Sequence, residues 1–557
     1  MRGTMRILGA LSLLVAAVGT PACAAPTDDA DSTEGAATEV NPTYVGDGVI
    51  AALNGAHAGD RDKSWGVSSD NAFPEDFLQQ IPPPDSWGKS NLANAETCKE
   101  GDAGCDADFL LKTCASQSDC KSGGVCTKLE SSIAHPGQKA KSFCAGHSDR
   151  FLDQMYGIIA HGKRFVDVTS LTAPDGRFEA AVRNAITFAT DSVPNIEIRL
   201  MFGNFPGSLL FTKSVMESLT RDVRAGSKAN ITVAGYRQGL LSWNHSKIVA
   251  ADGEIALVGG INMWTPHYLD KDPVHDMSMK VEGGAAIDAH VFANQIWDFA
   301  CKDSGFLSIE TLISSYPDAK ASCGPRFVAT KQKTAGARVI SVGRLGAIGG
   351  NPADTAIVAM IDAAKKTLRL SQQDLGPVKK VGVSIQGWPE AVMIALLGAM
   401  GRGVDVDLAL SNLNATPGSV SPLTTSYSNG WSLADVAAKF KSLAEDHRDV
   451  LPGNTDIEAL ICSKLHLVNL RSSARSDWPD GRKLASHAKL IVVDDRTFYL
   501  GSQNLYIANL AEHGFIVTDR AATEKVLKEY YQPMWNLSKS TLASGSDAPE
   551  CTLRAAN

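Results

Sequence analysis

The 557-residue chain lacks the long apolar runs of a membrane-spanning protein and the excess of basic residues of a nucleic-acid-binding one. The apolar run from Ile7 to about Val18 is shorter than the ~20 apolar residues that a spanning helix needs. Lys and Arg number 53 against 61 Asp and Glu, which gives a formal net charge of −8. A duplex-binding protein normally presents a basic surface, because phosphate neutralisation supplies much of its affinity. We therefore expect neither a membrane span nor a nucleic-acid partner.

The N-terminal segment has the features of an export signal. Arg2 and Arg6 precede the apolar run and small residues follow it, in the order typical of a secretory signal peptide. We predict a signal peptide over residues 1–25 and a flexible linker over 26–44, where the residues are small, polar and acidic. The expected localisation is secreted. Lipidation of Cys23, giving an anchored lipoprotein, is the alternative, although "TPAC" lacks the usual aliphatic residue.

The cysteines also favour an oxidising compartment. Ten of the eleven follow Cys23, an even number that is compatible with five disulfides. Six lie between Cys98 and Cys144 at an irregular spacing that does not suit a zinc site. We predict a small disulfide-stapled insertion over residues 98–144. The two further pairs predicted are Cys301 with Cys323 and Cys462 with Cys551.

Beyond the insertion, one order of elements occurs twice. A strand, a helix, a second strand and a closing hairpin are predicted from "RFVDVTSL" (164–171) onward and again from "LRLSQQDL" (368–375) onward. Alternating strands and helices of this kind predict sheets covered by helices. The predicted fold class is therefore α/β, with two similar halves. Residues 45–325 form the first half, including the insertion, and residues 326–557 form the second.

The closing hairpin of each half carries the same His-x-Lys-x-x-x-x-Asp pattern. The members are His245, Lys247 and Asp252 in the first half and His487, Lys489 and Asp494 in the second. The period of two in a strand places the histidine and lysine of each copy on one face. "ADGE" and "VDDR" are turn sequences, so we assign the two aspartates a structural role at the hairpin corners.

A second short pattern follows each hairpin at the same offset. It comprises Gly259, Gly260 and Asn262 in the first half and Gly501, Ser502 and Asn504 in the second. A single copy of such a motif carries little weight, but two copies at matching offsets are difficult to attribute to chance. The small residues are predicted to leave room for a ligand beside the histidine and lysine.

These residue types suit phosphodiester chemistry. Two lysines would neutralise the phosphate anion, and two asparagines would donate to its oxygens. One neutral imidazole could attack phosphorus while a second, protonated one supplies a proton to the leaving alcohol. Such a site needs no metal, and we predict no cofactor. Asp270, Asp272 and His275 lie close together in the sequence and are interpreted as a loop, as are His267 and His513.

The paired motifs resemble the phospholipase D superfamily, and in particular the secreted bacterial phospholipases D of the Streptomyces type. "LSWNHSK", "GGINMW", "PVHDMSM", "LSQQDL" and "FYLGSQNLY" carry the resemblance, which extends from about Val45 to the C-terminus. The cysteine-rich insertion has no counterpart in that group. The resemblance implies two α/β/α sandwich domains related by a pseudo-twofold axis, with one site at their seam.

The resemblance also implies roles for individual residues. His245 would be the nucleophile and His487 the general acid, an order that the sequence alone cannot establish. Asp276 in "PVHD" and Glu512 in "NLAEHG" match the family's acidic partners, although the family usually has Asp at the second place. We expect a crossed arrangement, with Glu512 on His245 and Asp276 on His487. The aromatic residues matching the family's headgroup pocket are Trp264, Tyr268 and Tyr427.

The predicted function is that of a secreted phospholipase D. It would hydrolyse phosphatidylcholine-type lipids to phosphatidic acid and free headgroup, with transphosphatidylation to alcohols. We expect a monomer that contacts a membrane or micelle surface transiently. The alternatives are a superfamily nuclease or other phosphodiesterase, and a secreted lipid-binding or receptor-binding protein that uses the cysteine-rich module.

Overall fold

The computed structural model describes residues 43–545, apart from 205–209, 239–241, 303–312, 317–322, 331–334, 378, 381–382, 385–386, 417–426, 476 and 507. The predicted signal peptide, Cys23, Cys551 and nearly all of the predicted linker lie outside the described residues. Among the described helices, none is long and apolar enough to cross a membrane.

The first half is built on a nine-stranded sheet. Its order is β12 (Ile313–Tyr316), β7 (Asn230–Gln238), β6 (Glu197–Gly203), β5 (Phe165–Ser170), β9 (Ile248–Ala251), β10 (Ile255–Gly259), β11 (Asp276–Glu282) and β2 (Leu78–Ile81), with β8 (Ser242–Trp243) paired to β7. Every residue of the central strands β5 and β9 is buried, so both faces of the sheet are covered there. Such strands require a helical layer on each side.

The second half is built on an eight-stranded sheet. Its order is β1 (Trp65–Asn71), β13 (Ala337–Leu345), β21 (Ala511–Val517), β20 (Thr497–Gly501), β19 (Lys489–Val493), β14 (Thr367–Gln372), β17 (Asp405–Leu410) and β18 (Leu465–Asn469). The series β7-β6-β5-β9-β10-β11 and β18-β17-β14-β19-β20-β21 have the same order. In both, three parallel strands are followed by three antiparallel ones. The predicted repeat is therefore a repeat of tertiary structure.

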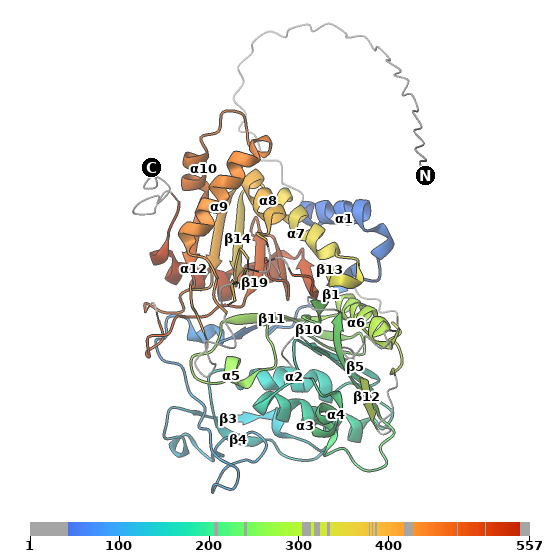
Figure 1. Ribbon diagram of the computed structural model, residues 1–557. Coiled ribbons are helices and arrows are strands. Elements are labelled where there is room, and N and C mark those ends of the chain that lie inside the picture. Colours follow the sequence, from blue (N-terminus) through green and yellow to red (C-terminus); the bar gives the residue numbers. More distant parts are fainter. Residues whose placement is uncertain are drawn as a thin grey trace, which may run out of the picture. The chain divides into compact units, whose positions relative to one another are not determined.

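Helices cover both sheets (Figure 1). The first half has α2 (Phe151–Ala160), α3 (Gly176–Ser192), α4 (Thr212–Thr220) and α6 (Gly284–Lys302), and the second has α7 (Pro352–Ala363), α8 (Glu390–Gly401), α9 (Leu433–Asp446), α10 (Ile457–Lys464), α11 (Arg520–Val526) and α12 (Gln532–Ser538). One buried cluster joins the halves, because it contains side chains of α6 together with Met277 from β11 and Phe498 from β20. The two sheets therefore share a continuous apolar core.

The N-terminal segment adds to both sheets. The helix α1 (Tyr44–Ala56) packs on α7, and β1 pairs with β13 of the second sheet. Both elements therefore belong to the second half. The strand β2 pairs with β11 of the first sheet. Residues 44–71, which the sequence assigns largely to the first half, thus complete the second half.

The insertion contains one hairpin and three disulfides. The hairpin is formed by β3 (Val125–Leu129) and β4 (Lys141–Ala145). The bridges are Cys98–Cys105, Cys114–Cys126 and Cys120–Cys144. The predicted pair Cys301–Cys323 is present, and Cys462 is disulfide-bonded. Although Cys114, Cys120 and Cys126 lie close together, their Sγ atoms are used by disulfides and offer no thiolate to a metal.

Candidate active site

His245 lies at the junction of the two halves. It comes just before β9, and its backbone N–H donates to the carbonyl of Ala511 at the start of β21 (2.8 Å). Its Nδ1 atom lies 2.9 Å from Oε1 of Glu512, the next residue on that strand. The second half thus supplies both the backbone and the carboxylate that orient this imidazole.

His487 repeats this arrangement with the halves exchanged. Its backbone N–H donates to the carbonyl of His275 (2.7 Å), and its Nδ1 atom lies 2.7 Å from Oδ2 of Asp276. The crossed pairing expected from the family resemblance is therefore present. His275, which the sequence suggested lay in a loop, is buried directly before β11, with its ring stacked on Tyr530.

The two imidazoles face one another across the seam. Their ring centroids are 6.2 Å apart, with an interplanar angle of 80°. Because a carboxylate engages each Nδ1, the Nε2 atoms are left for chemistry, as in a catalytic triad. The separation allows one phosphorus atom to be reached from both rings, one on each side.

Two buried lysines flank the histidines. Lys247 Nζ donates to the carbonyl of His245 (2.7 Å), and Lys489 Nζ donates to that of His487. Burial lowers the pKa of both lysines, and the pKa of Lys489 falls to about 8. Two cations held this close together repel one another, so a bound anion would relieve their repulsion.

Burial also shifts the pKa values of the histidine and carboxylate pairs. It lowers the pKa of His245 and His487 well below the usual range, and the two lysine charges lower them further. It raises the pKa of Asp276 to about 6 and that of Glu512 to about 7. The free site therefore favours neutral imidazoles, one of which is the form needed for nucleophilic attack.

The two motif asparagines follow strands β10 and β20. Asn262 and Asn504 are buried, and the Oδ1 atom of each has no hydrogen-bond partner. Asn504 Nδ2 donates to the hydroxyl of Tyr506 (2.8 Å). If the amide is turned by 180°, a choice that hydrogen-bond networks decide, the tyrosine donates to Oδ1 and an amide N–H is freed for a phosphate oxygen.

The small residues of the motifs allow strands to approach closely. A Cβ atom on Gly260 would collide with the carboxylate of Asp276, and one on Gly259 would collide with the backbone of Ser278. The Gly501 position is closed in the same way by Gly514. Ser502 pairs with the backbone of His513, donating to its carbonyl and accepting its N–H at 3.0 Å. His513 was interpreted as a loop residue but lies inside β21.

The two motif aspartates are hairpin anchors. Asp252 and Asp494 occupy the turns with φ of 58° and 51°. The Asp252 carboxylate accepts the backbone N–H groups of residues 163–165 at 2.7–2.8 Å. The Asp494 carboxylate accepts those of residues 365–367 at 2.7–2.9 Å. Each therefore ties its hairpin to the start of the neighbouring strand, as the structural role predicts.

The three predicted aromatic residues have different surroundings. Tyr268 is fully buried, and its hydroxyl donates to Asp276 (2.8 Å). The Tyr427 ring lies 5.0 Å from that of His487, edge to face, and its hydroxyl contacts His267 Nδ1. Trp264 lies 4.6 Å from the His267 ring. His267 therefore lies on the short helix α5 (Thr265–Tyr268), between two of the aromatics, and is not a loop residue.

Sequence patterns did not reveal two polar residues beside the site. Arg344 on β13 approaches the second carboxylate oxygen of Glu512 with its Nη1 (3.4 Å). The contact suits the side chain of Glu512, which is one methylene longer than the Asp that the family resemblance led us to expect. Asp374 is buried after β14, and its pKa is raised to about 8 by burial. Asp374 lies in the "LSQQDL" segment that carries the family resemblance, but the sequence analysis assigned it no role, and no local motif signals Arg344.

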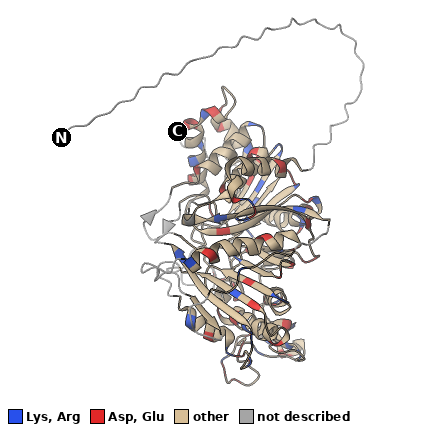
Figure 2. Cartoon of the chain, turned by 90° about the vertical axis from the view of Figure 1, so that its right-hand side faces the viewer, with Lys and Arg blue, Asp and Glu red and all other residues tan. Residues whose placement is uncertain are grey.

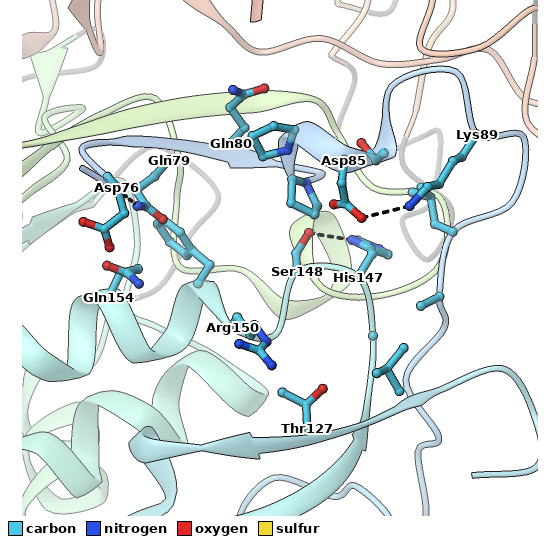
Figure 3. A pocket seen from close by; sticks show the side chains of 18 of the residues that line it. Asp76, Gln79, Gln80, Asp85, Lys89, Thr127, His147, Ser148, Arg150 and Gln154 are labelled. Carbon is cyan, nitrogen blue, oxygen red and sulfur yellow. Dashed lines mark hydrogen bonds and ion pairs between the residues drawn. The ribbon is translucent and has the colours of Figure 1, made fainter. Parts of the chain in front are cut away.

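A cavity lies apart from the paired histidines, lysines and asparagines. It has a volume of about 580 Å³ and is lined by polar side chains from β2, the insertion and the start of α2, including Gln79, Arg150 and Gln154 (Figure 3). Its lining includes none of the paired motif residues. This cavity is therefore separate from the paired histidines and lysines.

This chain is similar to known proteins in sequence and in fold. No protein-family model matches the chain. The chain is 29% identical to a phospholipase D of Streptomyces antibioticus, and the match covers 72% of this chain and 79% of the relative. It is similar to a phosphatidylserine synthase structure from Haemophilus influenzae (15% identity, TM-score 0.48, 70% of this chain and 85% of that chain).

A second solved structure, the phospholipase D family member Nuc from Salmonella typhimurium, shares 18% identity at a TM-score of 0.22. The match covers 36% of this chain and 96% of that one. The match to the Streptomyces relative covers more of the chain than either half contains, so it extends over both halves. With two such motifs converging on one seam, the chain resembles the phospholipases D in both sequence and site geometry.

Proposed function

We propose that the protein is a phospholipase D that cleaves phosphatidylcholine-type glycerophospholipids to phosphatidic acid and free headgroup. The observation that carries the proposal is the placement of His245 and His487, one from each half, 6.2 Å apart with a carboxylate behind each. The name and coverage of the Streptomyces relative support the lipid substrate.

In the first step, Nε2 of His245 attacks phosphorus and the bond from phosphorus to the headgroup oxygen breaks. His487 donates its proton to that oxygen, so the headgroup leaves as an alcohol. The phosphatidyl group remains on His245 as a phosphohistidine. Lys247 and Lys489 hold the non-bridging oxygens, and their charges matter most where negative charge accumulates.

In the second step, His487 takes a proton from water, the water oxygen attacks phosphorus, and the bond to His245 breaks. A primary alcohol that replaces the water gives transphosphatidylation. The negative phosphodiester itself favours the protonated form of His487, since an opposite charge nearby raises an imidazole pKa. Substrate binding would thus favour the protonated His487 that the first step needs.

The headgroup would leave on the side of Tyr427, whose ring contacts His487. With Trp264, it offers aromatic faces that suit a quaternary ammonium through cation–π attraction. We also propose that the protein acts outside the cell as a monomer, in transient contact with a lipid surface. Disulfides in the described residues support the oxidising compartment.

The rival functions are a nuclease and a non-catalytic binding protein. Basic and acidic residues are interspersed over the described chain (Figure 2), which supports a zwitterionic lipid over a polyanion. The test incubates the protein with phosphatidylcholine vesicles and ethanol and measures choline and phosphatidylethanol. We expect both products from the parent and neither from His245→Ala. Plasmid nicking without choline release would favour the nuclease, and vesicle binding without turnover would favour the binding protein.

A further inference from the structure

Glu512, the carboxylate behind His245, is held through both of its oxygens. Its Oε1 atom lies 2.9 Å from His245 Nδ1, and its Oε2 atom lies 3.4 Å from Nη1 of Arg344. Arg344 lies directly opposite Glu512 in the pairing of β13 with β21, and both side chains are buried. A carboxylate that is engaged on two sides by charge-assisted contacts is fixed in its orientation towards the imidazole.

Arg344 also connects Glu512 to the second motif. Its Nε atom lies 3.2 Å from Oδ2 of Asp354, in the first turn of α7. The other carboxylate oxygen of Asp354 accepts a hydrogen bond from Nε2 of Gln503 at 2.6 Å, and Gln503 immediately precedes the motif asparagine. A line of polar contacts thus runs from the carboxylate behind His245 to the loop that would hold the phosphate.

The other histidine has a different contact behind its carboxylate. Asp276 accepts the hydroxyl of Tyr268 (2.8 Å) on the same oxygen that contacts His487. A hydroxyl is neutral, whereas the guanidinium behind Glu512 is charged at any pH near neutrality. The two pairs therefore differ in charge, and the arginine lies on the side of the imidazole that would attack phosphorus.

The protonation state of Glu512 decides which nitrogen of His245 is free. An ionised carboxylate accepts Nδ1–H and leaves a lone pair on Nε2. A protonated carboxyl would instead donate to Nδ1 and place the imidazole hydrogen on Nε2, which could then not attack. Burial raises the pKa of Glu512 to about 7, and the charge of Arg344 is the largest influence that opposes this rise.

Other charged groups near Glu512 are less constant than Arg344. The titratable and charged groups that face this carboxylate are His245, Lys247, Lys489, Arg344, Asp354, Tyr499 and Tyr506. Burial lowers the pKa of both lysines, and both would be engaged by the phosphate. Arg344 is therefore the permanent cation on which the ionised state of Glu512 depends.

We propose that Arg344 is a positioning residue for the nucleophile, which holds Glu512 as the ionised acceptor of His245 Nδ1–H and so keeps Nε2 free to attack phosphorus. The inference rests on the proposed phospholipase D function and adds a residue to its site. It also gives a reason for the glutamate at position 512, because this side chain contacts His245 and Arg344 at once.

The test compares Arg344→Gln with the parent on dibutyrylphosphatidylcholine, a soluble substrate, from pH 5 to pH 9. Without the guanidinium, Glu512 takes up a proton at a higher pH, because a nearby cation lowers a carboxyl pKa. We expect the acid limb of kcat/KM to move to higher pH by about one unit, which is a loss of about tenfold on that limb. The loss should be smaller near pH 8, where Glu512 is ionised again.

Three variants serve as controls. Arg344→Lys keeps a positive charge and should restore most of the acid limb. Arg338→Gln should behave as the parent, because Arg338 lies on the same strand but pairs with Asp47 (2.7 Å), away from the site. Asp354→Asn removes a negative charge that raises the pKa of Glu512, so it should move the limb the opposite way, to lower pH. The Asp354 side chain is half-exposed, and this variant covers a folding defect in Arg344→Gln.

Two results would overturn this inference and leave the proposed function standing. One is an acid limb that stays in place in both Arg344→Gln and Asp354→Asn, and the other is a loss in Arg344→Gln that is equal at every pH. A parent that releases no choline would overturn the proposed function, and this inference with it.

Discussion

His245 Nδ1 lies 2.9 Å from Oε1 of Glu512, a residue from the other half of the molecule, while Arg344 approaches the second carboxylate oxygen. The carboxylate can stabilise a positive charge on the imidazole as it attacks. Glu512→Gln keeps the size of the side chain but loses that charge. We expect kcat on phosphatidylcholine to fall by roughly 10²- to 10⁴-fold, as when a triad carboxylate becomes an amide.

Glu512→Asp is the matched control, since it keeps the charge and should lose less activity. Unfolding midpoints of the two variants should be compared, so that a folding defect is separated from a catalytic one. Equal kcat for Glu512→Gln and the parent would show that the pair does not assist His245.

Activity should decline in alkaline solution because of Lys489. Burial lowers its pKa to about 8, so the ammonium loses its proton, and its attraction for phosphate, as the pH rises through that value. Burial shifts the pKa of Lys247 in the same direction. We expect kcat/KM to fall by about tenfold per pH unit above pH ~8, as measured from initial rates with a soluble phosphodiester. A constant kcat/KM from pH 7 to pH 10 would contradict this assignment.

Asp252 should matter for stability more than for chemistry. Its carboxylate accepts three backbone N–H groups at the hairpin turn, and Asp252→Ala leaves them without that partner. We expect the free energy of unfolding to fall by about 3 kcal/mol. Chemical denaturation of the variant measures the loss. Asp494→Ala should repeat it in the second half, and Asp252→Asn, which keeps one acceptor, should lose less.

The cysteine-rich insertion should be separable from catalysis. The Cys120–Cys144 bridge spans 24 residues, and its removal by a double substitution to Ser should cost about 3 kcal/mol of stability within the insertion. No candidate catalytic residue lies in residues 98–144, so kcat on phosphatidylcholine should not change. Limited proteolysis reports the local opening, and loss of activity in a folded variant would assign the insertion a part in the reaction.

Much of the architecture could be predicted from periodicity. Runs such as "RFVDVTSL" and "HAKLIVVDDRTFYLG" carry the strands and turns in their local pattern, because side-chain alternation and turn chemistry act over a few residues. The repeat of two histidine and lysine motifs likewise predicted two similar halves. Placement of Asp252 and Asp494 in hairpin turns followed from the same local rules.

Contacts between strands that are far apart in the sequence could not be predicted from local pattern. The approach of Arg344 to Glu512 and the burial of Asp374 depend on how the strands of the second sheet are assembled, and no spacing along the chain encodes this assembly. The packing of α1 and β1 on the second half was likewise not predicted from the sequence. The sequence by itself determined the chemical groups and their local geometry. Only the tertiary structure decided which groups meet, because burial of one shared core brings together residues that are hundreds of positions apart.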